Sequence, residues 1–389
     1  MNYKERDEIK IITGVRGVGK TSILKLFRQK LIDSGIDSDC IISIDLESVK
    51  YCFTSYAIIL YDLVAGKIVS GKRNFLLIDE VQRVNDWQEV IIKLKANFDI
   101  DIYISNSGAS IIDDEFCDKL KYKPLEIHVL PLSFKEYLDF ISNEGLNIDV
   151  DKAFGDYLNF GGMPIPSAID NLGYLRNIFF STMAQDVLAG SKIVDNSTVL
   201  LIAKILFTEM GHIHSFNSIG KILIEIEEKS PSVRTIENYI KMLVDAKLFY
   251  TVPVFDIKLN CSLTRYIKYY PVDLGIYSLM IGSHEIYDKN ILESIIYFEL
   301  LRLGVKVSTC KIGNKKVAFL AESKDNKIYI HVSNSVKDSN NNFKAKEFFA
   351  PLRAINDHYS KWILTLDKVS AHSQDGIRIS NIIDFLLDE

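Results

Sequence analysis

Hydrophobic and polar positions along the first 135 residues follow two alternating rhythms. Short runs of apolar or β-branched residues, as buried strands have, lie at 10–13, 41–45, 75–78 and 101–105. Elsewhere, as in the segment 20–31, apolar residues recur every three or four positions and predict helices. Strands that alternate with helices are typical of a parallel sheet. The pattern therefore predicts an α/β domain over residues 1–135.

The rest of the chain shows three further patterns. Residues 136–196 are predicted to form a helical subdomain, and residues 197–255 predict three helices followed by a hairpin, the order of a winged helix. Ser232 is a suitable N-cap for the third of these helices, over 232–246. Residues 256–389 are predicted as a second α/β domain, with helices at 289–303 and 343–356 and strands at 305–310, 316–320, 327–333 and 361–366.

A phosphate-binding loop lies between the first predicted strand and helix, where residues 14–21 match G-x-x-x-x-G-K-[ST]. Glycines let the backbone N–H groups turn inward, and the helix that follows directs its positive dipole end at the same anion. Lys20 is expected to reach the β- and γ-phosphates of ATP, and Thr21 to hold Mg²⁺. The predicted nucleotide-binding residues are Gly14, Val15, Arg16, Gly17, Val18, Gly19, Lys20, Thr21 and Ser22.

Two acids follow the apolar run at 75–78, in the manner of a Walker B strand. Asp79 is predicted to hold Mg²⁺ through water, and Glu80 to polarise the attacking water. The strand at 101–105 ends in a polar segment, where Ser107 is expected to sense the γ-phosphate. The predicted catalytic residues are therefore Lys20, Glu80 and Ser107.

Several stretches resemble a prokaryotic family of AAA+-type P-loop ATPases fused to a C-terminal domain of unknown function. They are Gly14-Val15-Arg16, 79–84 with Trp87, 130–137, Gly161-Gly162-Met163-Pro164, 235–240 and 268–275, so the resemblance covers nearly the whole chain. The chain departs from the family pattern at Gly17, at 105–107, and at Tyr122-Lys123, where the family has a Gly-Arg pair. If that arginine acts as a sensor or finger, only Lys123 is available to substitute for it.

The C-terminal domain of this family is thought to share the restriction-endonuclease-like PD-(D/E)xK fold, and the element order predicted for 256–389 resembles it. The resemblance places the acidic positions of such a nuclease at Glu293, Lys316 and Ala318, and a polar position at His331. Only Glu293 is a carboxylate, and we expect it to be a solvated helical residue. Metal-assisted cleavage needs several carboxylates, so we expect no nuclease activity.

Composition narrows the remaining choices. A net charge of −5 argues against a wholly electrostatic nucleic-acid binder. Lys306, Lys311, Lys315 and Lys316 are nevertheless predicted to form a local basic patch, and with the winged helix they leave weak or conditional nucleic-acid binding open. The five cysteines are scattered without C-x-x-C spacing, which favours reduced thiols in the cytoplasm. The polar start of the chain is not that of a signal peptide, and no apolar run approaches membrane-spanning length, so no membrane contact is expected.

Three functions stay open from the sequence. The first is a Mg²⁺-dependent ATPase whose nucleotide state moves the winged-helix and C-terminal parts. The second is a nucleic-acid-binding effector licensed by ATP, and the third is a nucleotide-stabilised scaffold with little turnover. The intact Walker residues favour the first over the third. All three imply ATP or ADP as a ligand and an unidentified protein or nucleic-acid partner.

Overall fold

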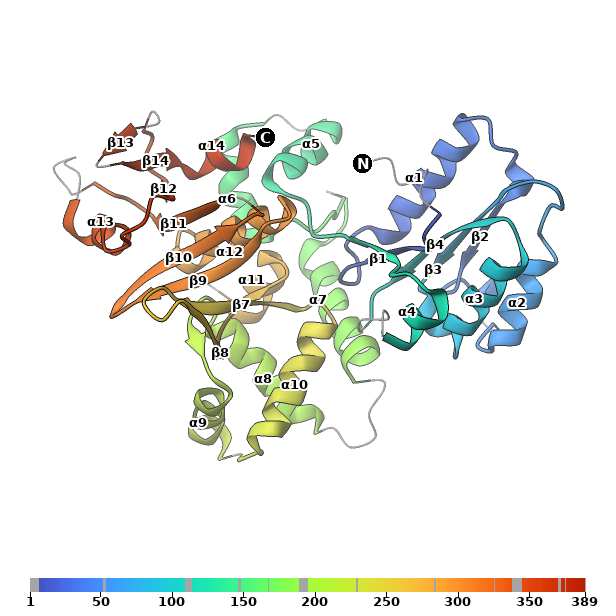
Figure 1. Ribbon diagram of the computed structural model, residues 1–389, viewed down its shortest axis with the longest axis horizontal. Helices are drawn as coiled ribbons and strands as arrows, with labels where there is room; N and C mark the ends of the chain where they lie inside the picture. The colour runs from blue at the N-terminus through green and yellow to red at the C-terminus, as the bar shows by residue number, and fades with distance from the viewer. Residues whose placement is uncertain are drawn as a thin grey trace. The chain divides into compact units, whose positions relative to one another are not determined.

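The computed structural model describes residues 7–51, 54–108, 114–145, 148–166, 168–188, 195–228, 230–282, 285–324, 326–337, 345–369, 372–374 and 376–388. The chain folds as two compact units. Unit 1 contains Met1–Leu130, Ser181–Gly190 and Asp245–Lys247, and unit 2 contains the remainder. Figure 1 shows both units, coloured along the chain.

Unit 1 is built on a five-stranded sheet in the order β2-β3-β4-β1-β5. Its neighbouring strands all pair in parallel. The strands are β1 (Lys10–Thr13), β2 (Ile41–Asp45), β3 (Asn74–Asp79), β4 (Ile100–Asn106) and β5 (Leu125–His128). The predicted parallel α/β domain is thereby confirmed, and β4 lies between β1 and β3. The loop after β1, the acids after β3 and the polar end of β4 therefore meet at one edge.

Helices cover both faces of this sheet, which explains why its strands are continuously apolar. Side chains alternate along β3, so Phe75 and Leu77 pack with α1, while Leu76 and Ile78 belong to the core that includes α2 and α3. Figure 1 shows α1 on one side of the sheet and α2 and α3 on the other. The helices of unit 1 are α1 (Lys20–Asp33), α2 (Ala57–Ala65), α3 (Trp87–Asn97) and α4 (Asp114–Leu120).

Unit 1 also contains a short segment from far along the chain. The chain leaves unit 1 after Leu130 and returns for Ser181–Gly190, in which Met183–Val187 forms a π-helical turn. Met183 and Val187 are buried there. Below we call Ser181–Gly190 the return segment.

Unit 2 contains helices and one large mixed sheet. Its helices are α5 (Phe134–Asn143), α6 (Val150–Phe160), α7 (Asn171–Thr182), α8 (Asn196–Thr208), α9 (Phe216–Glu227), α10 (Val233–Asp245), α11 (Leu274–Ile281), α12 (Lys289–Arg302), α13 (Ala345–Arg353) and α14 (Ile382–Leu387), of which α7 reaches into the return segment. The helices predicted at 232–246, 289–303 and 343–356 are present as α10, α12 and α13.

The sheet of unit 2 has nine strands in the order β13-β14-β12-β11-β10-β9-β7-β8-β6. They are β6 (Ile213–His214), β7 (Phe249–Asp256), β8 (Cys261–Pro271), β9 (Lys306–Ile312), β10 (Lys315–Glu322), β11 (Lys327–Ser333), β12 (Ser360–Thr365), β13 (His372–Gln374) and β14 (Ile377–Asn381). The hairpin β7–β8 joins the later strands through a parallel pairing of β7 with β9. The division at residues 135, 196 and 255 stays a prediction.

Three stretches that carried the family resemblance pack together in unit 2. Asp273, after β8, accepts hydrogen bonds from the backbone N–H groups of Gly162, Gly275 and Ile276. A Cβ at Gly162 would lie 2.3 Å from the Leu132 carbonyl oxygen, so a glycine is needed there. The Leu132 N–H also donates to the Gly162 carbonyl at 2.7 Å. These stretches form a structural junction.

Candidate functional site

The phosphate-binding loop connects β1 to α1 in the conformation that its glycines allow. Gly19, at the N-cap of α1, has φ 106°, in the left-handed region that favours glycine. A Cβ at Gly14 would lie 2.5 Å from the Val129 carbonyl oxygen. The backbone therefore needs glycine at both positions, as the motif predicts.

Lys20 is the first residue of α1 and is only 3% exposed. Its Nζ donates to the carbonyl oxygens of Gly14 at 2.9 Å and Val15 at 3.1 Å, and lies 3.6 Å from Glu80 Oε1. Burial lowers the pKa of Lys20, although the negative charge of Glu80 opposes this effect. The ammonium therefore lies among the loop carbonyls and beside the Glu80 carboxylate.

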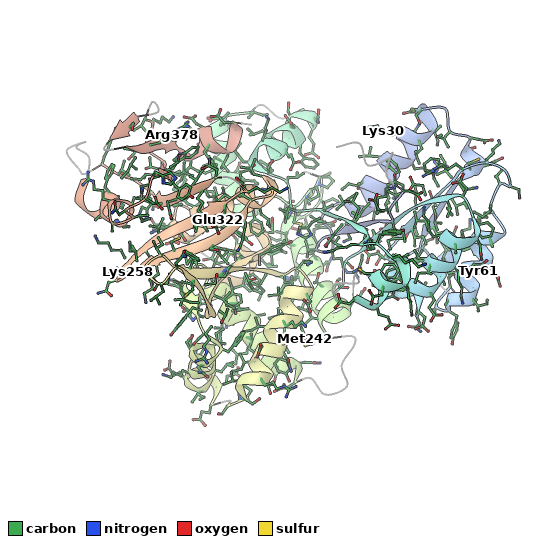
Figure 2. The ribbon with its side chains drawn as sticks, viewed as in Figure 1. Lys30, Tyr61, Met242, Lys258, Glu322 and Arg378 are labelled. Carbon is green, nitrogen blue, oxygen red and sulfur yellow. The ribbon has the colours of Figure 1, made fainter. Side chains whose placement is uncertain are left out.

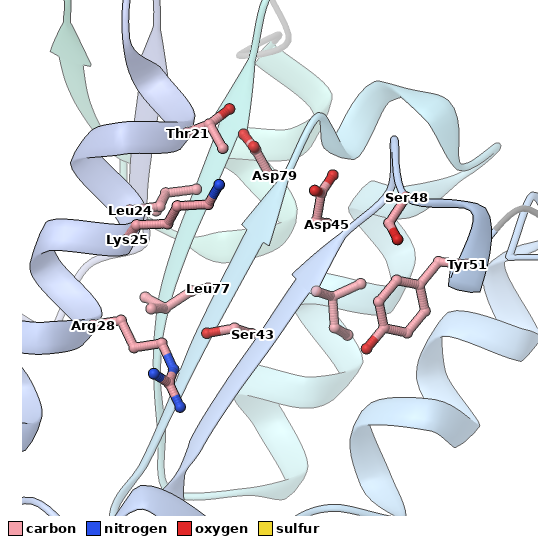
Figure 3. A pocket seen from close by; sticks show the side chains of 11 residues that line it. Thr21, Leu24, Lys25, Arg28, Ser43, Asp45, Ser48, Tyr51, Leu77 and Asp79 are labelled. Atoms are coloured by element: carbon pink, nitrogen blue, oxygen red, sulfur yellow. The ribbon is translucent and has the colours of Figure 1, made fainter.

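Asp79 is the last residue of β3, and its carboxylate accepts hydrogen bonds from Ser105 and Thr21. Burial raises the pKa of Asp79, and these two hydrogen bonds offset only part of the effect. Figure 3 shows Thr21, Asp79 and Asp45 around a cavity of about 190 Å³ beside α1. The two predicted Mg²⁺ residues, Thr21 and Asp79, are thus brought together.

Glu80 follows β3 in the left-handed conformation, with φ 57°. Its Oε2 accepts from the Ser107 hydroxyl at 2.6 Å and from the Gln82 amide, and lies 3.8 Å from Arg16 Nη2. The Ser105 hydroxyl accepts the Glu80 backbone N–H at 2.9 Å, which links β4 to the turn. The predicted catalytic residues Lys20, Glu80 and Ser107 therefore form one cluster.

Arg16 connects this cluster to the return segment. Its guanidinium donates to both carboxylate oxygens of Asp186, at 3.2 Å each, and to Glu47 Oε1 at 2.7 Å. Burial alone would lower the pKa of Arg16, but the carboxylates of Asp186, Glu80 and Glu47 together outweigh it and raise the pKa. Arg16 also donates to the Ser107 hydroxyl at 3.2 Å. Ser107 and Arg16 thus link Glu80 to Asp186.

Lys123 lies at the opposite edge of the sheet from this cluster. It is exposed and precedes β5, whose first residue, Leu125, pairs with Lys10 at the start of β1. The P-loop follows Thr13 at the other end of β1, about 10 Å along the strand from Lys10. Within one chain, Lys123 therefore does not reach this cluster, and its role as a substitute for the family's arginine stays a prediction. Arg16 is the arginine at the cluster.

Sequence reasoning missed the roles of Gln82 and Asp186. Gln82 lies two residues after Glu80, within the segment 79–84 that carried the resemblance, so its proximity was available from the sequence. Asp186 is separated from Arg16 by 170 positions, and no local pattern joins them. Ser22, assigned to the nucleotide site, lies on an exposed position of α1.

Two expectations for unit 2 are also corrected. Glu293 is only 2% exposed, so it is not a solvated residue. Its buried charge pairs with Lys268 at 2.7 Å inside unit 2. The four lysines do not form one patch. Lys316 lies opposite Lys311, but Lys306 pairs with Glu322 at the far end of β9, and Lys315 points to the other face of β10. Glu322 is labelled in Figure 2.

The chain is similar to other proteins over nearly its whole length. An uncharacterised protein of Haemophilus influenzae is 30% identical over 391 residues, which cover 100% of this chain and 96% of that protein. The chain belongs to that protein's family. Residues 6–138 match the AAA domain family, and residues 151–285 match a domain of unknown function, DUF8612. Unit 1 therefore contains an AAA-type P-loop domain.

A more distant relative and two solved structures extend the comparison. The uncharacterised protein MJ1544 of Methanocaldococcus jannaschii is 27% identical over 94% of this chain and 81% of its own length. The Walker-type ATPase PABY2304 of Pyrococcus abyssi has a TM-score of 0.48 and 12% identity, over 70% of this chain and 90% of its own. AMPPCP-bound DnaA from Aquifex aeolicus has a TM-score of 0.30 and 13% identity, over 63% and 84%. These two similarities are too low to carry a functional argument.

Two kinds of feature are absent from the described residues. No helix there combines the length and the apolar character that crossing a bilayer requires. Nor do three or more His, Cys, Asp or Glu side chains in that part of the chain gather as a metal cluster.

Proposed function

We propose that this protein is a Mg²⁺-dependent ATPase whose nucleotide state controls the parts of the chain beyond the AAA domain. The observation that carries the proposal is the cluster around Glu80. A P-loop lysine, a Walker B acid pair and a polar strand end converge there, as ATP hydrolysis needs.

The residues present fit a nucleotide. The P-loop backbone passes so close to Val129 that a Cβ at Gly14 would collide with it, and a glycine-rich loop of this kind can turn its N–H groups toward an anion. Lys20 supplies the cation inside that site. Thr21 and Asp79 offer the oxygen ligands that Mg²⁺ prefers, and the burial that raises the pKa of Asp79 supports this role, because a bound cation would favour the carboxylate. Bound Mg²⁺ would neutralise the developing charge on the phosphates.

Glu80 orients the attacking water and accepts its proton in this proposal. Ser107 and Gln82 both bond to Oε2, so they set the direction of the carboxylate. Ser107 also lies directly after β4, where its hydroxyl can donate its hydrogen bond to a phosphate oxygen instead of to Glu80. Arg16 places a permanent positive charge near the same atoms, at 3.8 Å from Glu80.

The return segment supports the control of the other domains by nucleotide. The residues before and after Ser181–Gly190 belong to unit 2, yet this segment belongs to unit 1 and supplies Asp186 to Arg16. We infer that a change at the P-loop or at Glu80 reaches Asp186 through Arg16 and pulls on the chain at both ends of the return segment.

Two finer assignments of fold belong to the same proposal. The order α8, β6, α9, α10, β7, β8 supports a winged helix, and β6 pairs with β8 as a small sheet would. The order α12, β9, β10, β11, α13, β12 supports a nuclease-like core for the C-terminal part. A reducing cytoplasmic location is supported by Cys40, Cys117, Cys261 and Cys310, which are free thiols.

Glu80→Gln tests the ATPase. The amide cannot accept the proton of water, so hydrolysis should fall by about 100-fold or more, while ATP affinity stays within a few-fold. Phosphate release measures the first and calorimetry the second. Glu89→Gln is the matched control, because Glu89 pairs only with Lys93 on the surface of α3 among the contacts described. Equal turnover in wild type and Glu80→Gln would remove Glu80 from the mechanism. ATP binding without turnover in the wild type would favour the scaffold instead.

A further inference from the structure

Unit 2 has a cavity of about 150 Å³ that is separate from the nucleotide site. It lies among the start of α12, strands β8, β9 and β10, and residues 211–213. The side chains that line it and matter here are Lys268, Lys289, Asn290, Glu293, Thr309 and Lys316. The volume is below the range of pockets that hold whole drug-sized molecules, so it suits a small group or the end of a larger molecule.

The inner wall of the cavity is a buried ion pair. Lys268 Nζ lies 2.7 Å from Glu293 Oε2, and the Tyr270 hydroxyl donates to the same oxygen at 2.9 Å. Burial alone would raise the pKa of Glu293, but the charges of Lys268 and Lys289 outweigh it and lower the pKa. Glu293 is therefore an anion at neutral pH, and Lys268 is the nearer of the two lysines that compensate its charge.

Two more lysines stand at the rim. Lys289 lies 3.7 Å from the second oxygen of Glu293 and has a half-exposed side chain, and Lys316 is exposed on β10. Three lysines against one carboxylate leave the lining with two net positive charges. Among neighbouring groups, burial lowers the pKa of His331 to about 4, so it is neutral, and the Asp288 carboxylate caps α12 by accepting the Asn290 N–H at 2.7 Å.

The lining favours an anion over a metal ion. Lys268 Nζ occupies the position beside Glu293 that a cation would take. Ala318, across the cavity, has no side-chain ligand atom, and Thr309 donates its hydroxyl to the Ala318 carbonyl at 2.6 Å. The Asn290 amide adds a neutral donor group at the wall. Ammonium groups at a small site match a compact tetrahedral dianion best.

We propose that this cavity binds a phosphate monoester, with Lys289 and Lys316 as the rim contacts and Lys268 as the inner charge. The dianion balances the two net charges of the lining. Its source is either a small phosphate, free or on a nucleotide, or the 5′-terminal phosphate of a nucleic-acid strand. An internal phosphodiester carries one charge and lies within a continuous backbone, so it fits the cavity less well.

The test uses the full chain carrying Lys20→Ala, which removes the ammonium of the P-loop as a competing phosphate site. A short single-stranded DNA with a 3′ fluorophore and a 5′ phosphate is titrated by fluorescence polarisation at fixed low salt, beside the same strand with a 5′ hydroxyl. Inorganic phosphate and AMP serve as competitors, and inorganic phosphate is also titrated directly by calorimetry.

Lys289→Ala and Lys316→Ala should each weaken phosphate binding by about tenfold, which is the loss expected for one charge-assisted contact. Both lysines are exposed, so the fold should tolerate their loss, and the thermal midpoint checks this. Lys306→Ala, at the far end of β9, is the matched control and should change nothing. Lys268 is left intact because its loss would strand Glu293 as a buried unpaired charge.

Two results support the proposal and name the source. A 5′-phosphorylated strand that binds tenfold tighter than its 5′-hydroxyl counterpart points to a nucleic-acid end. Inorganic phosphate and AMP that bind as tightly as the strand point to a small molecule. Three results overturn it: no measurable phosphate binding, binding that Lys289→Ala and Lys316→Ala leave unchanged, or equal binding of both strands without competition by phosphate. None of these depends on ATP hydrolysis, so the proposed ATPase stands or fails separately.

Discussion

Lys268 and Glu293 form a buried ion pair whose stability depends on both partners. Glu293 is 2% exposed, and Lys268 is 7% exposed. Taking one charge away leaves the other without water and without its partner, whereas taking both away removes the desolvation penalty as well. Lys289, at 3.7 Å and half exposed, can offset only part of the loss of Lys268.

Lys268→Met should therefore destabilise unit 2 by about 3–5 kcal/mol, and Lys268→Met combined with Glu293→Leu should recover most of that loss. The chain has two tryptophans, Trp87 in unit 1 and Trp362 in unit 2. Urea unfolding followed by fluorescence in a Trp87→Phe background consequently reports unit 2. A double variant that is no more stable than the single one would contradict this account of the pair.

At the scale of elements, Asp273 joins the end of α6 to the start of α11. One carboxylate oxygen accepts the N–H groups of Gly275 and Ile276 and caps α11, while the other accepts the Gly162 N–H. The group is fully buried. Burial raises the pKa of Asp273 to about 6, although these backbone N–H groups act in the opposite direction.

This pKa predicts a stability that falls as pH rises. Because the folded pKa of about 6 lies above the ordinary value of 3.8 for an aspartate, the folded state binds more protons between these values than the unfolded state. The contribution is most favourable below pH 4 and is lost as pH rises to 6, by about 3 kcal/mol. The measurement is the free energy of unfolding of wild type minus that of Asp273→Asn, across pH 4–7. A difference independent of pH would contradict the assignment, since only the wild type has this titrating group.

At the scale of the whole molecule, the return segment belongs to unit 1 although the residues before and after it belong to unit 2. Arg16 lies in the P-loop, and its bidentate contact with Asp186 holds the segment within unit 1. A bidentate guanidinium–carboxylate contact fixes direction as well as distance. We propose that a movement of Arg16 with the nucleotide is transmitted to the flanking chain.

Asp186→Asn should uncouple nucleotide binding from unit 2. Hydrogen exchange of α8, α9 and α10 is compared with a non-hydrolysable ATP analogue and with ADP. The wild type should show a difference between the two nucleotides, and Asp186→Asn should lose it while ATP affinity stays within a few-fold. Gln185→Ala is the control, because Gln185 contacts only the exposed Arg83, at 3.4 Å, among the contacts described. A difference that persists in Asp186→Asn would refute the role of this contact.

Many elements were predictable because their signals are local. The strands at 41–45, 75–78 and 101–105 lie within β2, β3 and β4, and the helix at 232–246 is α10. The spacing of apolar residues in these stretches indicates whether one face or both faces are buried, and this spacing distinguishes a helix from a strand. The predicted site residues Lys20, Thr21, Asp79, Glu80 and Ser107 meet because the strands that precede them pair in one parallel sheet. Each follows or ends a parallel strand, and the strand ends share an edge.

Sequence alone determined the P-loop, the acid pair and the alternation of strand and helix, because glycine conformation, capping and apolar spacing act over a few residues. Tertiary structure decided which charges meet. Lys268 reaches Glu293 across 25 positions, and Arg16 reaches Asp186 across 170. Lys123 takes the place of an arginine in the family pattern. It precedes β5, and because β5 runs parallel to β1, it lies beside the start of β1 and away from the P-loop. Charge pairing depends on which strands and helices become neighbours, and no local pattern records that choice.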